Sequence, residues 1–459
     1  MRRIHSGHVM LGALAAACLH APKALHKSYP PSRIRHHSTD LTLALHCTHT
    51  ARLTELPAMD VRRGARSMPS ILPVLLVSVL LLVAATSVHG REAAAAGSTG
   101  AGASAGSSGG PTTTTKKKNM GKQQTAGKKT KKTVPSLVVF GDSIVDPGNN
   151  NDISTIVKAN FVPYGHDFGQ DHRPTGRFCN GRIPTDFIAS KLGLKELLPA
   201  YLAPNLTKHD ILTGVSFASG GTGYDPLTAQ LASVISMTDQ LRMFDDYKQQ
   251  VRSAGGDAAL RTMLTDGVFA VCAGSDDVAN TYFTMRARSD YSHASYAELM
   301  VSHATAFLDG LLAAGARRVA IISMPPIGCV PSQRTLSGGL SRGCSEGHNE
   351  IATMVNAGMH DSVEALKTKH PGSKVVLMDI YGYLLDMMMR PGSYGFREST
   401  LGCCGTGMME VSVLCNGVTS AVCGDVRDYL FWDSYHPTEK AYKILVDYVY
   451  DNYLQQLIA

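Results

Sequence analysis

Two short motifs, far apart in the chain, contain the three side-chain types that activate an oxygen nucleophile. Residues 140–143 read Phe-Gly-Asp-Ser and end an apolar segment, and residues 433–437 read Asp-Ser-Tyr-His-Pro near the C-terminus. A serine hydroxyl is a poor nucleophile until a neighbouring base takes its proton, and that base needs a third group to orient it. We therefore predict that Ser143, His436 and Asp433 act together in nucleophilic catalysis.

Five short apolar segments, separated by helical patterns, are predicted to position these side chains. The segments typical of buried strands are residues 137–140, 215–218, 268–273, 319–323 and 374–380. Helical patterns predict helices at residues 183–192, 296–314, 345–369 and 437–457, and one or two helices at residues 227–251. This alternation favours a parallel sheet covered by helices on both faces. Because active sites of such sheets lie beyond the carboxyl ends of the strands, motifs that follow strands are expected to converge there.

Two glycine-containing motifs also follow predicted strands. Residues 217–223 read Phe-Ala-Ser-Gly-Gly-Thr-Gly, and residues 273–277 read Ala-Gly-Ser-Asp-Asp. Glycines let a backbone N–H approach a reacting oxygen closely. Together with residues 140–143 and 433–437, these motifs resemble the blocks of the SGNH/GDSL hydrolase superfamily. The resemblance is strongest to its plant GDSL esterase/lipase branch, and it runs from about residue 135 to the end of the chain.

Four further stretches resemble that branch. They are residues 146–150 (Asp-Pro-Gly-Asn-Asn), 175–178 (Thr-Gly-Arg-Phe), 325–329 (Pro-Pro-Ile-Gly-Cys) and 402–407 (Gly-Cys-Cys-Gly-Thr-Gly). The resemblance implies a three-layer α/β/α sandwich of the flavodoxin-like type with a five-stranded parallel sheet. It also implies a serine ester hydrolase that cleaves carboxylic esters of lipid, cutin-type or acetylated substrates through an acyl-enzyme. Neither a metal nor an organic cofactor is implied.

The roles of the site residues follow from the same resemblance. Ser143 matches the nucleophile and, through its backbone N–H, one donor of the oxyanion hole. Gly220 matches a second backbone donor, with Gly221 as the alternative if the register differs by one. His436 matches the general base that takes the serine proton and returns it to the leaving group, and Asp433 matches the residue that holds the imidazole in the right tautomer.

One residue departs from the family pattern. The third block normally reads Gly-x-Asn-Asp and its amide donates to the oxyanion, but Asp276 stands in that position. An ionised carboxylate donates no hydrogen bond, and loss of one such donor costs about 2.7–4 kcal/mol. Either Asp276 is protonated because burial and Asp277 raise its pKa, or two backbone donors suffice, or the enzyme is weak or silent. We expect an altered but functional oxyanion hole formed by Ser143, Gly220 and Asp276.

Cysteine usage favours a secreted, disulfide-bonded protein, because eight of the ten cysteines lie in the part of the chain that carries the motifs. The disulfide candidates are Cys329, Cys344, Cys403, Cys404, Cys415 and Cys423. Cys329 and Cys344 bracket a Gly/Ser loop that they could close. Zinc is the competing interpretation of the last four, but adjacent Cys403 and Cys404 do not match the usual ligand spacing. No metal site is therefore predicted.

The charge of the chain is divided unevenly. Residues 1–133 hold 19 of the 44 basic and 4 of the 37 acidic residues, which leaves 25 basic and 33 acidic residues, a net charge of −8, in residues 134–459. The formal net charge of +7 therefore comes from the N-terminal part. It gives no reason to expect a nucleic-acid partner, and a small-molecule or lipid ester is the expected partner instead.

The chain is predicted to have four parts. Residues 1–67 show no sustained period and are interpreted as a non-structural extension, with translation starting at Met68. Residues 68–90 resemble a secretory signal peptide, and a membrane signal anchor is the alternative because the apolar run could just span a bilayer. Residues 91–133, rich in Gly, Ala, Ser, Thr and Lys, predict a disordered linker whose lysines could contact a membrane or cell wall. Residues 134–459 form the predicted hydrolase domain.

Several other residues receive structural predictions. Asn205, in Asn-Leu-Thr, is a glycosylation candidate. Cys272 is expected to be a buried thiol, whereas His348 and the other histidines outside the motifs are expected at the surface. The aromatic residues at 429, 431, 432 and 435 either line an acyl pocket or pack in the core.

Two alternatives to a secreted ester hydrolase remain open. A catalytically weak or silent lipid- or wall-binding protein could be built on the same scaffold. An acyltransferase would use the same acyl-enzyme and differ only in whether water or an alcohol accepts the acyl group. The sequence gives no indication of the oligomeric state.

Overall fold

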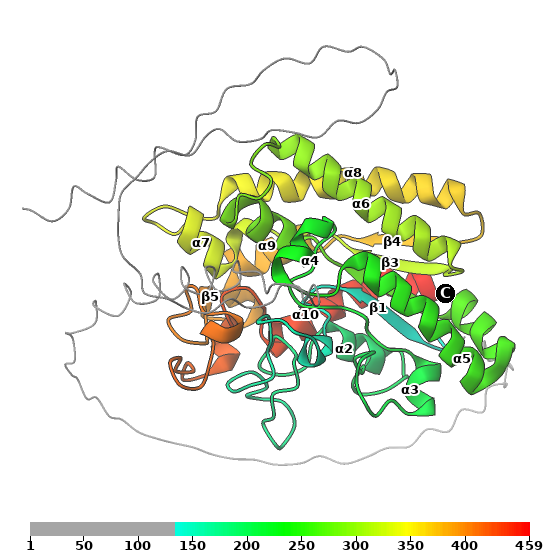
Figure 1. The fold of residues 1–459 in the computed structure, drawn as a ribbon. Coiled ribbons are helices and arrows are strands. Elements are labelled where there is room, and N and C mark those ends of the chain that lie inside the picture. The colour runs from blue at the N-terminus through cyan, green and yellow to red at the C-terminus, as the bar shows by residue number, and fades with distance from the viewer. Residues whose placement is uncertain (1–133) are drawn as a thin grey trace, which may run out of the picture. The chain divides into compact units, whose positions relative to one another are not determined.

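A computed structural model describes residues 134–459 (Figure 1). The predicted N-terminal extension (1–67), the signal-like segment (68–90) and the linker (91–133) lie outside the described residues. None of the helices within the described part combines the length and apolar character needed to cross a membrane.

A parallel sheet of four strands forms the centre of the fold. The strands, in both chain order and spatial order, are β1 (Leu137–Gly141), β2 (Val268–Cys272), β3 (Arg318–Ile322) and β4 (Lys374–Met378). All three neighbouring pairs are parallel. Every residue of β1 and β2 is buried, as expected for continuous apolar strands with helices on both faces. The predicted fold class is therefore confirmed.

The predicted fifth strand, residues 215–218, does not form a regular ladder. Ser216 makes isolated parallel bridges to Val139 of β1 and to Ala200. The segment keeps three backbone hydrogen bonds to β1, which join Val139 to residues 215 and 217 and Gly141 to residue 219. The N–H of Gly141, which would continue this ladder, donates instead to the Gln240 side chain at 2.8 Å. On the outer side the Asn149 side-chain amide donates to the carbonyls at 216 and 218, at 2.9 and 2.7 Å, so the segment is an irregular edge beside β1.

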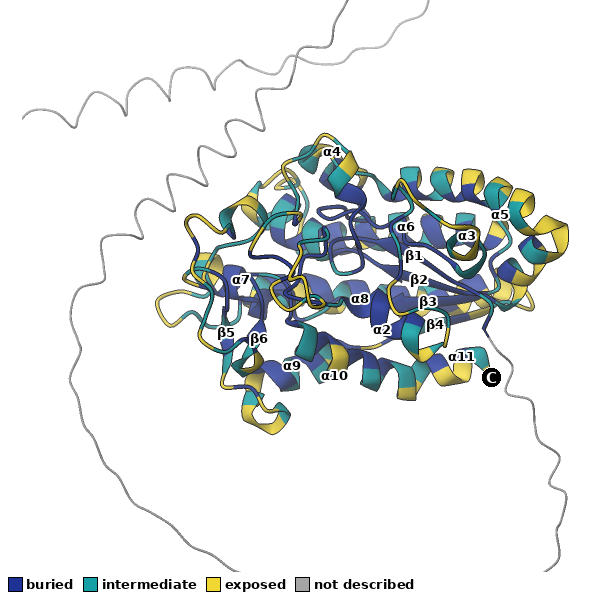
Figure 2. Cartoon of the chain, turned by 90° about the horizontal axis from the view of Figure 1, so that it is seen from below, coloured by how far each residue is buried: buried dark blue, intermediate teal, exposed yellow. Residues whose placement is uncertain are grey.

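Helices cover both faces of the sheet. Their bounds are α2 (Pro184–Lys191), α3 (Lys208–Thr213), α4 (Pro226–Ala232), α5 (Met237–Asp266), α6 (His293–Ala313), α7 (Pro331–Ser337), α8 (Glu346–Lys369), α9 (Tyr381–Met389), α10 (Glu439–Val449) and α11 (Gln455–Ile458). Figure 2 shows α5 and α6 on one side of the strands and α2, α10 and α11 on the other. The predicted final helix begins two residues later than expected, because Thr438 caps it, and a π-helical turn at Tyr450–Leu454 separates α10 from α11.

Two hydrophobic cores follow from the alternation of side chains along each strand. In β1, Val138 and Phe140 pack with residues of α5, α6 and α8. Leu137 and Val139 face the opposite way and pack with residues of α2, α10 and α11. Successive side chains of a strand point to opposite faces of the sheet, so one short apolar run supplies both cores and holds the end of β1 rigidly.

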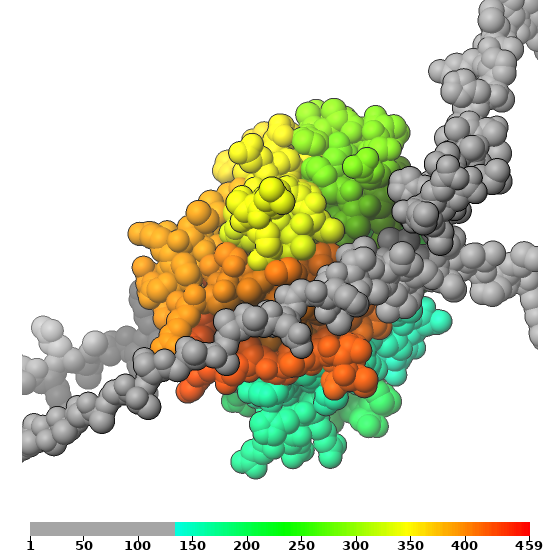
Figure 3. Space-filling model, turned by 90° about the vertical axis from the view of Figure 1, so that its left-hand side faces the viewer, coloured from blue at the N-terminus to red at the C-terminus, as the bar shows by residue number. Residues whose placement is uncertain are grey.

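A small accessory region was not predicted. It contains a two-stranded parallel sheet, β5 (Glu398–Gly402) with β6 (Tyr429–Phe431), and the loop between these strands. A third apolar cluster joins the cysteines at 403, 404 and 415 of this region to Trp432 and Tyr164, which lie outside it. Figure 3 shows α7, in yellow, beside the orange chain of this region on one face of the molecule.

One of the predicted surface histidines is instead buried. His348 on α8 has no exposed surface, and its ring stacks on Phe283 with the ring centroids 3.7 Å apart. Its Nδ1 lies 2.6 Å from the Ser345 hydroxyl oxygen, and burial lowers the pKa of His348 to about 4. Since α8 turns this position toward the core, the surface prediction for His348 was wrong.

Candidate active site

The three side chains of the predicted triad form one hydrogen-bonded chain. The Ser143 Oγ lies 2.7 Å from His436 Nε2, and His436 Nδ1 lies 2.8 and 2.9 Å from the two oxygens of Asp433. All three residues are buried. Because the carboxylate accepts from Nδ1–H, Nε2 is left as the acceptor for the serine hydroxyl, which is the arrangement that a general base needs.

A glycine at the end of β1 places Ser143. Gly141 has a φ of +143°, and a Cβ added there would lie 1.8 Å from the carbonyl oxygen of Cys272. The Gln240 side-chain amide bonds both the N–H and the carbonyl of Gly141, at 2.8 and 2.9 Å. A sharp turn that only glycine can make therefore presents Ser143 at the carboxyl end of the sheet.

The three-residue spacing of Asp433 and His436 has a local structural cause. Asp433 Oδ1 accepts the backbone N–H of Tyr435 at 2.8 Å and that of His436 at 2.7 Å. This turn returns the His436 ring to the same carboxylate. Phe178 packs against the ring, with centroids 5.2 Å apart. The imidazole is therefore held by this packing as well as by its hydrogen bonds to Asp433.

The backbone donor predicted at Gly220 is already engaged. Its N–H donates to Asp146 Oδ2 at 3.0 Å, and the Asn150 side-chain amide donates to its carbonyl at 2.8 Å. The resembling stretch at residues 146–150 thus fixes the backbone of this glycine loop. Gly221 is the glycine that lines the cavity beside Ser143, and within the described residues no acceptor is recorded for its N–H. The alternative register named from the sequence therefore fits better.

Asp276 lines the same cavity, and one of its two carboxyl oxygens accepts a hydrogen bond. The Asn280 amide donates to Asp276 Oδ1 at 2.7 Å. The Tyr435 hydroxyl donates to the Asn280 carbonyl oxygen at 2.9 Å and accepts from the Gln333 amide at 2.7 Å. Burial raises the pKa of Asp276 to about 6, against the opposing effects of His436 and of the Asn280 bond.

Asp277, the neighbour expected to raise the pKa of Asp276, has a different position. Its carboxylate accepts the backbone N–H groups of Tyr224 and Asp225 at 2.7 and 3.2 Å and the Thr228 hydroxyl. It begins a π-helical turn, Asp277–Thr284, and ties that turn to the start of α4. Its contribution is therefore structural, and burial is the main cause of the raised pKa of Asp276.

The serine and histidine open into a largely apolar cavity of about 610 Å³. This volume lies in the range typical of small-molecule sites, roughly 300–1,000 Å³. Its apolar lining residues include Ile144, Ile156, Val157, Phe178, Leu231, Ala232, Met285, Ile327, Val330, Leu336, Met409, Val411, Val413, Leu414 and Phe431. Of the predicted aromatic cluster, Phe431 and Tyr435 line the cavity, whereas Trp432 packs in the third apolar cluster.

All six candidate cysteines are disulfide-bonded. The pairs are Cys329–Cys344, Cys403–Cys423 and Cys404–Cys415. The first closes the loop that the sequence indicated, and the other two cross-link the accessory region. Cys272 is a buried free thiol, as expected. Asn205, the glycosylation candidate, is exposed in the loop before α3.

Sequence reasoning missed a residue that contacts the triad, Tyr164, and a second residue, Ser412, that bonds it. The Tyr164 hydroxyl lies 2.8 Å from Asp433 Oδ2, and the backbone N–H of Ser412 donates to Tyr164 Oη at 2.7 Å. Neither residue belongs to a stretch from which we predicted the site. The only sequence signal is the position of Ser412 between disulfide candidates, which indicates a stapled loop but not what the loop contacts.

Known proteins resemble this chain across the whole hydrolase part. The family model described as GDSL-like Lipase/Acylhydrolase matches residues 137–449. The GDSL esterase/lipase EXL3 of Arabidopsis thaliana is 49% identical over 328 residues, which cover 72% of this chain and 90% of that protein. The GDSL esterase/lipase EXL2 of the same plant is 42% identical over 338 residues, covering 70% and 89%. This chain therefore belongs to the GDSL-like lipase/acylhydrolase family and is a carboxylic ester hydrolase of the GDSL esterase/lipase type.

Proposed function

We propose that this enzyme cleaves esters of apolar acyl chains through an acyl-enzyme on Ser143. The observation that carries the proposal is the chain of hydrogen bonds from Ser143 through His436 to Asp433, which opens into an apolar cavity. Ser143 Oγ bonds to the ester carbonyl carbon while its proton passes to His436 Nε2. The same proton then goes to the departing alkoxide oxygen as the ester C–O bond breaks. Water then bonds to the acyl carbon while His436 Nε2 takes its proton, and that proton passes to Ser143 Oγ as the acyl C–Oγ bond breaks and the carboxylic acid leaves.

The oxyanion of the tetrahedral intermediate would be held by three donors. We assign them to the backbone N–H groups of Ser143 and Gly221 and to the protonated carboxyl of Asp276. Since Asp276 Oδ1 already accepts from Asn280, the acidic proton belongs on Oδ2, which can then donate. A buried carboxylic acid is able to take the place of an amide donor as long as it stays neutral.

The lining of the cavity favours medium or long acyl chains over acetyl groups. An acetyl group would leave most of the apolar walls in contact with water, whereas each methylene that is buried contributes about 0.8 kcal/mol. Ile156, Leu336 and Val413 line this cavity and are also exposed, at 41%, 47% and 40%. An apolar rim of this kind suits a substrate presented by a lipid or wall-polymer surface.

We also propose that the enzyme is secreted. Three disulfides support this localisation, because such bonds persist in oxidising compartments. Residues 68–90 would supply the signal peptide, and retention of that segment as a signal anchor is the alternative. N-terminal sequencing of the native protein checks both, since a peptide from residues 1–67 would contradict the proposed start at Met68.

Hydrolysis of p-nitrophenyl acetate, butyrate and octanoate by the purified protein tests the proposal. We expect kcat/KM to rise from acetate to octanoate and to be lost for all three esters in Ser143→Ala. Equal rates for Ser143→Ala and the unmodified enzyme would favour a silent lipid- or wall-binding protein. Formation of a transfer product with added alcohol, in place of free acid, would favour an acyltransferase.

A further inference from the structure

A buried tyrosine makes a hydrogen bond to the carboxylate of the proposed triad. Tyr164 lies in the loop between residues 153 and 183 and has no exposed surface. Its Oη is 2.8 Å from Asp433 Oδ2 and 2.7 Å from the backbone nitrogen of Ser412. The phenol therefore lies between the triad and the loop that carries Ser412.

The direction of these two hydrogen bonds is fixed by the groups involved. A backbone N–H only donates, so Tyr164 Oη accepts from Ser412 and directs its own proton to Asp433 Oδ2. Burial, followed by the nearby charge of Asp433, raises the pKa of the Tyr164 phenol far above its ordinary value. The phenol is therefore neutral and remains a donor to the carboxylate.

Without this phenol the two oxygens of Asp433 would be held unequally. Oδ1 accepts two backbone N–H groups, those of Tyr435 and His436. Apart from the shared His436 Nδ1, Oδ2 accepts only Tyr164 among the described residues. Tyr164 thus determines how the carboxylate plane is turned toward the imidazole.

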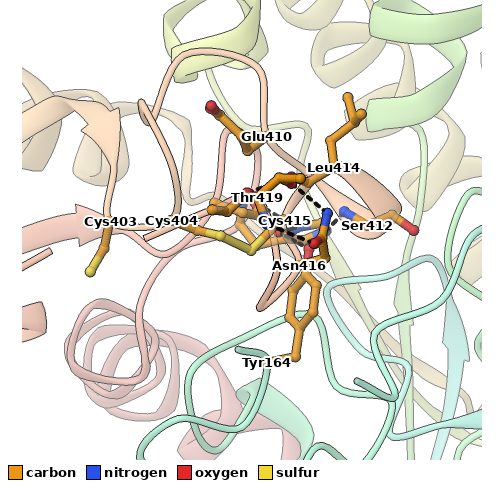
Figure 4. The surroundings of a disulfide bond; sticks show 12 residues. Tyr164, Cys403, Cys404, Glu410, Ser412, Leu414, Cys415, Asn416 and Thr419 are labelled. Atoms are coloured by element: carbon orange, nitrogen blue, oxygen red, sulfur yellow. Dashed lines mark hydrogen bonds and ion pairs between the residues drawn. A yellow bond between two sulfur atoms is a disulfide. The ribbon is translucent and has the colours of Figure 1, made fainter. Parts of the chain in front are cut away.

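The loop that holds Tyr164 is itself constrained by a disulfide. Ser412 lies in the segment closed by Cys404–Cys415 and has a φ of +49°, a left-handed conformation that is unfavourable for a non-glycine residue. Its hydroxyl donates to the carbonyl of Lys158 at 2.9 Å. Figure 4 shows Ser412 beside Tyr164 and close to this disulfide.

The same loop is a wall of the acyl cavity. Residues 411–414 line the cavity, as do residues 154–158, and the Ser412 hydroxyl donates to the carbonyls of residues 156 and 158 in that second segment. We propose that Tyr164 is a positioning residue for Asp433, and that the disulfide-closed segment 404–415 links the acyl-cavity wall to the triad through it. This inference rests on the proposed triad chemistry and adds to it a fourth residue and a structural link.

Tyr164→Phe tests the inference because it removes only the hydroxyl. A hydrogen bond to a charged group is worth roughly tenfold or more in rate, so we expect kcat on p-nitrophenyl butyrate to fall about tenfold with KM unchanged. Loss of a donor leaves Asp433 more negative toward the imidazole, which stabilises the imidazolium. The acid limb of the kcat/KM profile should therefore move to higher pH.

Tyr247→Phe is the matched control. Tyr247 is also buried, and its hydroxyl donates to the Ile211 carbonyl at 2.6 Å, away from the site. We expect it to lower thermal stability without moving the pH profile. A Tyr164→Phe enzyme with an unchanged kcat and acid limb would overturn the inference, provided that Ser143→Ala is inactive. If Ser143→Ala were fully active, the proposed triad itself would be wrong.

A double-mutant cycle tests the link through the loop. Replacing Cys404 and Cys415 by serine frees the segment, and we expect kcat to fall in the otherwise unmodified enzyme. In a Tyr164→Phe background the same replacement should have little further effect, because coupled residues are not additive. Fully additive losses would overturn the link. If the cysteine variant does not fold, Ser412→Ala, which removes the hydroxyl contacts with residues 156 and 158, takes its place in the cycle.

Discussion

The triad and the proposed oxyanion hole differ in how many of their hydrogen-bonding groups are already in position. On the triad side, both oxygens of Asp433 are filled by donors, and the His436 ring is held by Phe178. On the oxyanion side, the Gly220 N–H is taken by Asp146, and a carboxyl stands where relatives are expected to carry an amide. The proposed nucleophile thus has its base and orienting group in place, whereas stabilisation of the oxyanion would depend on a proton.

Changes on the triad side should have the largest effect. Asp433→Asn keeps the shape of the side chain but favours the wrong imidazole tautomer, so we expect kcat on p-nitrophenyl butyrate to fall roughly 10,000-fold. Thermal unfolding of the variant provides the control, since a folded protein with residual activity shows that orientation of His436 was lost. A decrease of less than tenfold would mean that the triad and the oxyanion hole do not differ as described.

Removing the donor on the oxyanion side should have an intermediate effect. Asp276→Ala is expected to reduce kcat about 100- to 1,000-fold near pH 5, where the carboxyl is protonated. Because the pKa of Asp276 is raised to about 6, the unmodified enzyme loses this donor as pH rises through 6. The penalty for Asp276→Ala should therefore shrink at pH 8.

Asp276→Asn supplies the matched comparison. An amide donates at every pH, so the ratio of kcat/KM for this variant to that of the unmodified enzyme should increase between pH 5 and pH 8. The stability of Asp276→Asn relative to the unmodified enzyme should likewise increase as the pH rises. A carboxyl whose pKa is raised on folding stabilises the fold below its unfolded value near 4 and loses that contribution as pH rises through 6. A ratio that stays constant with pH would show that Asp276 is not a proton-dependent donor.

Filling the acyl cavity should have the smallest effect and separates binding from chemistry. Leu231 on α4 lines the cavity and is not one of the residues that we assign to the chemistry. In Leu231→Trp we expect kcat/KM for the octanoate ester to fall about tenfold, the scale of discrimination that one or two methylene-sized contacts provide. The acetate ester should be hydrolysed at nearly the original rate. Equal losses for both esters would place Leu231 outside the acyl path.

Much of the fold could be predicted from local pattern alone. The apolar runs that became β1 and β2 are buried on both faces, so neither needed a tertiary context to be recognised. Residues 215–218 failed as a regular strand because the Gln240 side chain takes the Gly141 N–H that would continue their ladder with β1, a contact that no periodicity reveals. His348 failed for a related reason, since a histidine on a helix gives no sign of which face will be turned inward.

The sequence by itself identified the groups that we propose carry the chemistry. Ser143 follows a glycine turn, and Asp433 and His436 are three residues apart because one carboxylate bonds both the backbone and the ring of the same histidine. Only the tertiary structure decided which glycine faces the cavity, how the cysteines pair, and that Tyr164 and Ser412 support the carboxylate. Those choices depend on hydrogen bonds between residues far apart in the chain, and the packing of the whole domain fixes which of them can form.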